Sequence, residues 1–157
     1  MQETEYLEDS KAYIDKLRNI PTLSPFTKKN LEGLIRLSKI RKYQPEEVIL
    51  EEGGFDKWIY FLISGKVQVI KAGKTISTLQ RTGDIFGEMG IIDGSARSAT
   101  IQALDETVCL ATDASDINEL SGNDQLAFGY ILYRVFSEIL ANRLRVTSEE
   151  LVKAKEK

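Results

Sequence analysis

The middle of the chain, from about residue 38 to residue 112, is a series of short β-rich runs separated by turn signals. Eight runs follow one another: KIRKY, EVIL, WIYFLI, KVQVI, TISTL, DIFG, SATIQAL and TVCLAT. The turn signals between them include Gly53-Gly54, Ser64-Gly65, Ala72-Gly73, Gly83-Asp84 and Asp93-Gly94. Many short strands at intervals of roughly 8–12 residues are typical of an antiparallel barrel, sandwich or jelly roll. This segment therefore predicts a mainly β fold.

Two helices are predicted before the strands. Apolar residues recur at helical spacing among charged ones over residues 4–20, and Pro21 ends this pattern. Thr27 is suited to cap a second helix. Phe26 precedes it and Leu31 lies four positions into the helix, which is the arrangement of a hydrophobic staple.

A long helix is predicted after the strands, over residues 124–152, with a shorter helix capped by Asp113 before it. The long helix carries two apolar stripes. One stripe, at alternating spacings of four and three, contains Leu126, Tyr130, Tyr133, Ser137, Leu140, Leu144, Thr147 and Leu151. The other contains Phe128, Leu132, Val135, Ile139 and Val146. One stripe can cover the β core, and the second needs a ligand or a second copy of the chain, unless both are buried within one subunit.

The composition excludes most classes of enzyme. The chain has 157 residues, no histidine and one cysteine. Without histidine it lacks imidazole metal sites, the Ser-His-Asp and Cys-His nucleophilic pairs, and the ligands of oxygenases built on similar barrels. One cysteine excludes an intramolecular disulfide, a zinc cluster and a cysteine-ligated iron–sulfur cluster. We therefore expect no catalytic residues, no metal site and no enzymatic activity.

Charge and hydropathy exclude further partners. The net charge of -3 argues against a broad nucleic-acid-binding surface, because duplex binders usually carry a basic face. No apolar run approaches the ~20 residues of a membrane span. The N-terminus, MQETEYLEDSK, is acidic and polar, unlike a signal peptide. We expect a cytoplasmic protein with no nucleic-acid partner and no membrane partner.

The candidate binding residues concentrate over residues 83–100, in the run GDIFGEMGIIDGSARSAT. Gly87 lets the backbone approach a ligand closely. Arg97 can offer a two-pronged donor to phosphate oxygens, and the Ser98 hydroxyl and the Ala99 N–H can add further donors. A purely structural role is the alternative for a lone arginine, but these neighbours favour phosphate binding.

Glu88 lies in the same run and supplies a hydrogen-bond acceptor. A carboxylate repels a phosphate, so the expected partner of Glu88 is a hydroxyl donor such as a ribose. The alternative is a carboxylate that the helix dipole favours at a helix start. Taken together, Glu88 and Arg97 predict a site for a ribose joined to a phosphate in a compact geometry.

The run FGEMGIIDGSARSAT, residues 86–100, resembles the phosphate-binding cassette of cyclic nucleotide-binding domains. Such domains are found in catabolite-activator-like regulators, protein kinase A regulatory subunits and cyclic-nucleotide-gated channels. The resemblance covers residues 26–112, including Tyr43-Gln44-Pro45, Glu51-Glu52-Gly53 and the run IYFLISGKV. It implies an antiparallel β-roll, that is a jelly roll or double-stranded β-helix, with N-terminal helices and C-terminal B and C helices.

The resemblance also implies the roles of the cassette residues. Glu88 would accept a hydrogen bond from the ribose 2′-hydroxyl, and the Gly87 backbone would lie against the sugar phosphate. Arg97 would pair with the cyclic phosphate, aided by Ser98 and the Ala99 amide. The expected ligand-binding set is completed by Phe86 and Met89. The C helix would cover the base, and the candidate cap residues are Tyr130, Tyr133, Arg134 and Phe136.

The favoured hypothesis is a non-catalytic cyclic nucleotide sensor. The resemblance implies that its C-terminal helix moves onto the bound nucleotide and signals to an effector protein. Members selective for cGMP often carry threonine after the arginine, so Ser98 favours cAMP over cGMP as the ligand. One alternative is a fragment or relative of a catabolite-activator-type transcription regulator without its helix-turn-helix, because the chain stops at Lys157. Another is a degenerate protein-interaction module.

The predicted organisation has three parts. They are a helical extension over residues 1–23, a cyclic nucleotide-binding domain over residues 24–152, and a tail over residues 153–157. A homodimer would form through the long helix, with contacts at Leu140, Leu144 and Leu151. Two polar members of that stripe interrupt the contact surface, Ser137 and Thr147.

Overall fold

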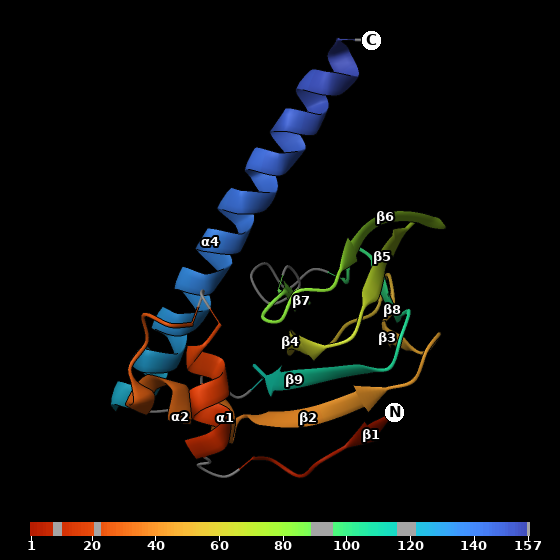
Figure 1. Ribbon diagram of the computed structural model, residues 1–157. Coiled ribbons are helices and arrows are strands. Elements are labelled where there is room, and N and C mark those ends of the chain that lie inside the picture. Colours follow the sequence, from red (N-terminus) through yellow and green to blue (C-terminus); the bar gives the residue numbers. More distant parts are fainter. Residues whose placement is uncertain (8–10, 21–22, 89–95, 116–121, 157) are drawn as a thin grey trace.

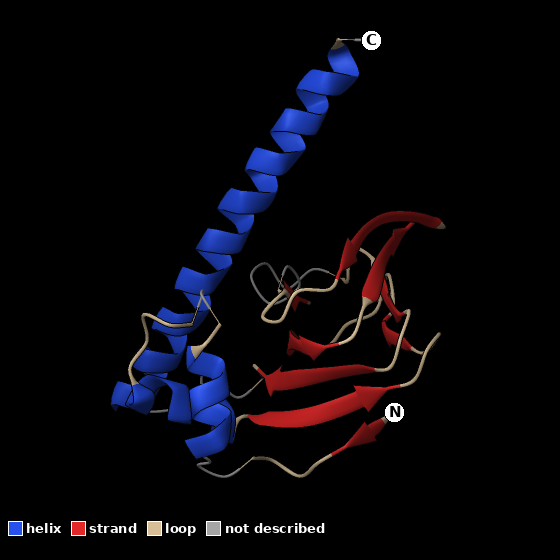
Figure 2. Ribbon diagram, viewed as in Figure 1, coloured by secondary structure: helices blue, strands red, loops and turns tan. Residues whose placement is uncertain are grey.

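The computed structural model describes residues 1–7, 11–20, 23–88, 96–115 and 122–156. In these ranges two antiparallel β-sheets form a roll, and the helices gather at one end of it (Figure 1, Figure 2). The C-terminal part of the longest helix runs out past the rest of the molecule (Figure 1). The longest helix therefore contacts the rest of the domain along only part of its length.

The first sheet has the strand order β1-β2-β9-β4-β7. Its strands are β1 (Gln2–Glu3), β2 (Ser38–Tyr43), β9 (Thr107–Asp113), β4 (Trp58–Ser64) and β7 (Ile85–Phe86). The second sheet has the order β3-β8-β5-β6. Its strands are β3 (Val48–Leu50), β8 (Thr100–Ala103), β5 (Val67–Lys71) and β6 (Lys74–Leu79). Each of the eight β-rich runs forms one of the strands β2 to β9, which confirms the predicted fold class.

Strand β4 separates two apolar cores. The helix-side core lies between the first sheet and the helices and contains Ile14, Leu17, Ile20, Leu23, Phe26, Leu31, Leu34, Ile35, Ile59, Phe61, Ile85, Leu110, Ala114, Ile131, Leu132, Val135 and Phe136. The roll core lies inside the roll and contains Tyr43, Leu50, Tyr60, Leu62, Val67, Phe86, Ile101, Ala103, Cys109 and Ala111. Successive side chains of a strand point to opposite faces, so β4 contributes Ile59 and Phe61 to one core and Tyr60 and Leu62 to the other. Burial on both faces accounts for the uninterrupted apolar run WIYFLI.

The helices are α1 (Lys11–Arg18), α2 (Lys28–Arg36) and α4 (Gly122–Lys155). Thr27 caps α2 as predicted, because its Oγ1 accepts a hydrogen bond from the Asn30 N–H at 3.2 Å. Phe26 and Leu31 are both buried in the helix-side core, as a hydrophobic staple requires. Within the described ranges, no helix combines the length and the apolar character that crossing a membrane demands.

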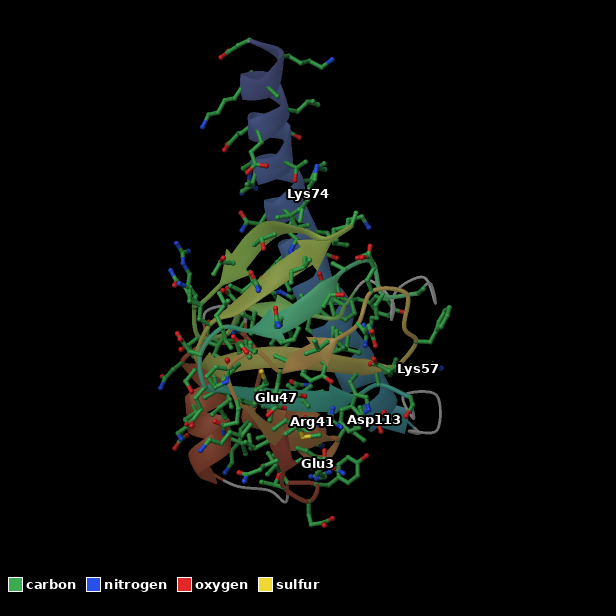
Figure 3. All side chains as sticks on the ribbon, turned by 90° about the vertical axis from the view of Figure 1, so that its right-hand side faces the viewer. Glu3, Arg41, Glu47, Lys57, Lys74 and Asp113 are labelled. Carbon is green, nitrogen blue, oxygen red and sulfur yellow. The ribbon has the colours of Figure 1, made fainter. Side chains whose placement is uncertain are left out.

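The first seven residues are not helical, which corrects the helix predicted over residues 4–20. Gln2–Glu3 pairs with the edge of β2, and the Leu7 N–H donates to a β2 carbonyl at 2.9 Å. Glu3 also forms an ion pair with Arg41 of β2 at 2.9 Å (Figure 3). The unpaired N–H and C=O groups of an edge strand favour such an added strand over a helix. The first helix in the described residues is α1.

Helix α4 is buried along one face of its first half and exposed in its second half. Side chains of the helix-side core come from its first half, and every described side chain from residue 140 onward is exposed. The helix ends at Lys155, so most of the tail predicted from residue 153 is helical. The short helix predicted after Asp113 lies mainly outside the described residues.

Candidate functional site

The cassette, residues 86–100, begins at the end of β7 and ends at the start of β8. Strand β7 pairs with β4, which places Phe86 opposite Tyr60, and the two rings stack with centroids 5.0 Å apart. The predicted ligand-binding residue Met89 lies outside the described residues. The chain returns at Arg97, whose N–H donates to the Gly54 carbonyl at 2.8 Å. Both ends of the cassette are therefore fixed to β4 or to the turn before it.

Gly87 is required by the protein around it. Its φ of +88° is a conformation that side-chain-bearing residues rarely adopt. A Cβ at this position would lie 2.9 Å from the Trp58 carbonyl oxygen and 3.3 Å from Nη1 of Arg97. The chain itself thus makes a close approach at Gly87, and the approach of a ligand there stays a prediction.

Arg97 is buried, with 5% of its surface exposed, and is held by protein groups. Its Nε and Nη2 donate to the two carboxylate oxygens of Asp56, and Nη2 also donates to the Trp58 carbonyl at 2.7 Å. Its Nη1 donates to the Gly87 carbonyl. These bonds fix the plane of the guanidinium, with Asp56 on the Nε–Nη2 edge and the cassette on the Nη1 side. The Asp56 side chain is 36% exposed, so the pair has one buried and one solvated member.

Glu88 is the second buried charge of the cassette, with 1% of its surface exposed. Arg143 of α4 donates from Nη1 to Oε1 of Glu88 and from Nη2 to the Ile85 carbonyl at 2.9 Å. The Arg143 side chain is 42% exposed. A buried carboxylate without a partner is strongly unfavourable, and here the partner comes from the C-terminal helix. The ion pair connects that helix to the cassette.

One cavity of about 770 Å³ brings these groups together. It is lined by the predicted residues Phe86, Gly87, Glu88, Arg97, Ser98 and Ala99. Apolar side chains from the two sheets form another part of the wall: Leu50, Val69, Ile76, Leu79, Ile85 and Ile101. Its volume lies within the range of ~300–1,000 Å³ that small-molecule sites occupy. The described members of the predicted ligand-binding set therefore share one cavity.

The four predicted cap residues do not line this cavity. Phe136 is buried in the helix-side core, and Tyr133 is exposed. Tyr130 contacts Phe26 edge-on at 5.6 Å, and Arg134 donates to the Tyr130 hydroxyl at 2.9 Å. The cavity-lining residues of α4 come later in the helix and are Glu138, Ile139, Asn142, Arg143, Val146, Thr147 and Glu150. In this arrangement the buried face of the first half of α4 packs in the helix-side core.

Asp56 and Arg143 are site residues that the sequence analysis missed. Arg143 had a detectable signal, because it lies four positions after Ile139 and three before Val146, within the second apolar stripe of the helix. A charge inside such a stripe predicts a buried partner of opposite sign. Asp56 had no comparable signal, since its contact with Arg97 spans 41 positions of the chain.

The cysteine of the chain, Cys109, is buried. Burial raises the pKa of the Cys109 thiol to about 12, so the thiol stays protonated near neutral pH and is a poor nucleophile. Among the described residues, no group of three His, Cys, Asp or Glu side chains is placed to hold a metal ion.

Comparisons with known proteins match the part of the chain that contains the cassette. The family model described as the cyclic nucleotide-binding domain matches residues 40–124, which is more than half of the chain. A cAMP-dependent protein kinase regulatory subunit of Debaryomyces hansenii is 31% identical over 110 residues, covering 70% of this chain and 24% of that protein. A cGMP-dependent protein kinase of Eimeria tenella is 35% identical over 95 residues, covering 60% of this chain and 9% of that protein. The chain thus spans a quarter or less of the length of these relatives.

The fold is also that of a solved domain. A cyclic nucleotide-binding domain from Methylobacillus flagellatus has a TM-score of 0.79 and 22% sequence identity, covering 91% of this chain and 84% of that one. This likeness agrees with the predicted β-roll. Together with the family match over residues 40–124, it makes the assignment plain: the chain belongs to the cyclic nucleotide-binding domain family.

Proposed function

We propose that this domain is a non-catalytic sensor that binds a cyclic nucleotide in the cavity between the cassette and α4. One observation carries the proposal: a buried cation, Arg97, and a buried anion, Glu88, line the same cavity. A cyclic nucleotide presents an anionic phosphate beside a neutral ribose hydroxyl. Arg97 is opposite in charge to the phosphate, and the Glu88 carboxylate can accept a hydrogen bond from the ribose hydroxyl.

The phosphate would bind on the Nη1 side of Arg97. Asp56 takes the Nε–Nη2 edge of the guanidinium, so the phosphate and the Asp56 carboxylate would contact different edges. Ser98 and Ala99 line the same cavity and supply a hydroxyl and an amide. Because protein bonds already fix the guanidinium, little side-chain entropy is lost when the phosphate binds.

The ribose hydroxyl would donate to the Glu88 carboxylate. Arg143 donates to Oε1 of Glu88, and a carboxylate accepts several hydrogen bonds, so both donors can be accommodated. The ribose and α4 would then share one acceptor. This sharing is the proposed route by which an occupied cavity changes the position of the helix.

The base would lie between the sheets and the second half of α4. Val69 and Ile76 line the sheet side of the cavity, and Ile139 and Val146 line the helix side. Two apolar walls suit the two faces of a purine. We therefore place the cap at this part of α4 in place of the four residues named from the sequence. Ser98 favours cAMP over cGMP as the ligand. The relatives include a cAMP-dependent and a cGMP-dependent kinase protein, so binding of the two nucleotides has to be compared directly.

The test is a thermal-unfolding series with cAMP, cGMP, AMP and buffer. A ligand present at a hundredfold its dissociation constant stabilises a folded protein by ~2.7 kcal/mol, which raises Tm by roughly 5–10 °C at this size. We expect cAMP to give the largest shift and AMP, which lacks the cyclic ester, to give little. Arg97→Lys should abolish most of the shift, because lysine cannot reproduce the planar fork. Arg145→Lys, on an exposed arginine of α4 outside the cavity lining, is the matched control. If no cyclic nucleotide moves Tm, the proposed function is wrong.

A further inference from the structure

The first seven residues lie along the edge of the first sheet, and we call residues 1–7 the strap. Gln2–Glu3 pairs with β2 in antiparallel register, and the N–H groups of Thr4 and Leu7 donate to β2 carbonyls at 3.0 and 2.9 Å. The side chains of residues 1–6 are exposed, and Leu7 is partly buried. The strap is therefore held by polar contacts, with little burial of apolar surface. Segments of this kind open locally at a small free-energy cost.

The strap carries the counter-ion of a cation in β2. The Arg41 side chain is 13% exposed, and its Nε donates to Oε2 of Glu3 at 2.9 Å (Figure 3). Its guanidinium carbon lies 4.1 Å from the centroid of the Trp58 ring, and its Nη1 donates to the Tyr60 hydroxyl at 2.9 Å. A guanidinium over an aromatic face is a favourable arrangement. A largely buried cation also needs an anionic partner, and in the described part of the chain the carboxylate that forms an ion pair with Arg41 is that of Glu3.

The two aromatic partners of Arg41 are residues of β4 that contact the cassette. The Tyr60 ring stacks on Phe86 with an angle of 6° between the ring planes. The Trp58 carbonyl accepts a hydrogen bond from Nη2 of Arg97 at 2.7 Å. Phe86 and Arg97 both line the cavity. Arg41 therefore contacts two supports of the cassette at once.

We propose that Arg41 is a positioning residue of the cassette and that the strap holds it in place through Glu3. With the strap on β2, the guanidinium fixes Trp58 and Tyr60, and these residues fix the cavity-lining groups before a ligand arrives. Preorganised groups lose less conformational entropy when a ligand binds. Without the strap, Arg41 loses its counter-ion and the two aromatic residues lose a common contact. Detachment of the strap from β2 would therefore lower the affinity of the cavity for its ligand.

The effect on affinity rests on the proposed function, whereas the contacts from Glu3 to the cassette need no ligand. Coupling between two sites is reciprocal. A nucleotide in the cavity should therefore also hold the strap on β2 more firmly. A strap that only covers the edge of β2 would need its backbone pairs alone, and removal of the Glu3 charge would then have no effect on the cassette.

Hydrogen exchange without nucleotide tests the positioning. Glu3→Gln keeps the shape of the side chain and removes its charge. We expect the Arg97 N–H, which bonds to the turn before β4, to exchange about fivefold faster in this variant, at the low end of couplings between two sites. Glu5→Gln, at an exposed residue of the strap, is the matched control. The N–H of the buried Ile131 is the internal reference, because a general loss of stability would accelerate its exchange as well. Unchanged exchange at Arg97, or equal acceleration at Ile131, overturns the proposal.

Nucleotide affinity tests the consequence. Titration calorimetry with cAMP and with cGMP should show about fivefold weaker binding by Glu3→Gln and unchanged binding by Glu5→Gln. Because Glu3 also pairs with Lys39 at 3.5 Å, a double-mutant cycle with Arg41→Gln separates the two contacts. The double variant Glu3→Gln/Arg41→Gln should bind no more weakly than Arg41→Gln alone. Additive losses would assign the effect to Lys39 and overturn the role of Arg41.

The reciprocal effect separates the remaining outcomes. Addition of the nucleotide should slow exchange of the Leu7 N–H in the wild type and leave it unchanged in Arg41→Gln, and circular dichroism verifies that each variant is folded. A wild type that binds neither cAMP nor cGMP would reject the proposed function, and exchange of the Arg97 N–H would then decide the positioning role. Equal nucleotide affinities of the wild type and Glu3→Gln would overturn the coupling and leave the proposed function standing.

Discussion

The two halves of α4 are attached to the domain by different forces. In the first half Ile131, Leu132, Val135 and Phe136 are buried in the helix-side core. Each such side chain stabilises the fold by about 1.5–3 kcal/mol through removal of apolar surface from water. In the second half the side chains are exposed, and Arg143 supplies a connection through Glu88 and the Ile85 carbonyl.

This difference separates anchoring from sensing. The buried side chains of the first half lie outside the cavity lining, so we expect that half to keep its place when the cavity is filled. The Arg143–Glu88 pair lies in the cavity wall, where a ligand can compete with it or join it. If the proposed function is correct, α4 would stay fixed up to Phe136 and would change its position between Phe136 and Arg143.

The largest expected effect comes from the anchored half. Ile131→Ala should lower the free energy of unfolding by about 3 kcal/mol, because Ile131 is fully buried and the smaller side chain leaves a cavity. Val152→Ala, in the exposed half, should change it by less than about 0.5 kcal/mol. Urea denaturation of both variants at one protein concentration measures the difference. Similar losses in the two variants would contradict the division of the helix.

A smaller loss is expected at the connection itself. Arg143→Ala leaves the buried Glu88 carboxylate without its cation, and we expect a loss of about 2 kcal/mol. This figure is below that of a fully buried pair because the Arg143 side chain is 42% exposed. Adding Glu88→Gln to Arg143→Ala should recover part of the loss, since no buried charge then remains unpaired. Arg145→Ala is the control, and an equal loss there would show that the ion pair contributes nothing specific.

The features predicted correctly from the sequence are local ones. Thr27, Phe26 and Leu31 form the cap and staple within five positions of one another. The run WIYFLI predicts a strand from its own composition, and the cassette run identifies the family without knowledge of any contact. Each of these signals depends on backbone geometry and short spacing, which a linear pattern records.

The features that the sequence analysis missed depend on contacts between distant segments. Glu88 meets Arg143 across 55 positions, and Arg97 meets Asp56 across 41. The first residues pair with β2 as an added strand because an open sheet edge lies beside them, which no helical pattern can reveal. The four candidate cap residues, Tyr130, Tyr133, Arg134 and Phe136, lie outside the cavity lining in this structure, and their role stays a prediction. At these positions the structure is determined by tertiary packing, which the sequence pattern does not specify.

The smallest expected effect decides which half of α4 covers the ligand. Val146→Ala removes two methyl groups from the cavity wall and should weaken nucleotide binding by about fivefold, the equivalent of about 1 kcal/mol. Arg134→Ala, at a position predicted as a cap, should change the affinity less than Val146→Ala, because Arg134 itself does not line the cavity and contacts it only through Glu138. Titration calorimetry with the nucleotide that gives the largest Tm shift measures both. If Arg134→Ala weakens binding more than Val146→Ala, the bound helix adopts a different register from the one described, and the first half of α4 moves with the ligand instead of serving as its anchor.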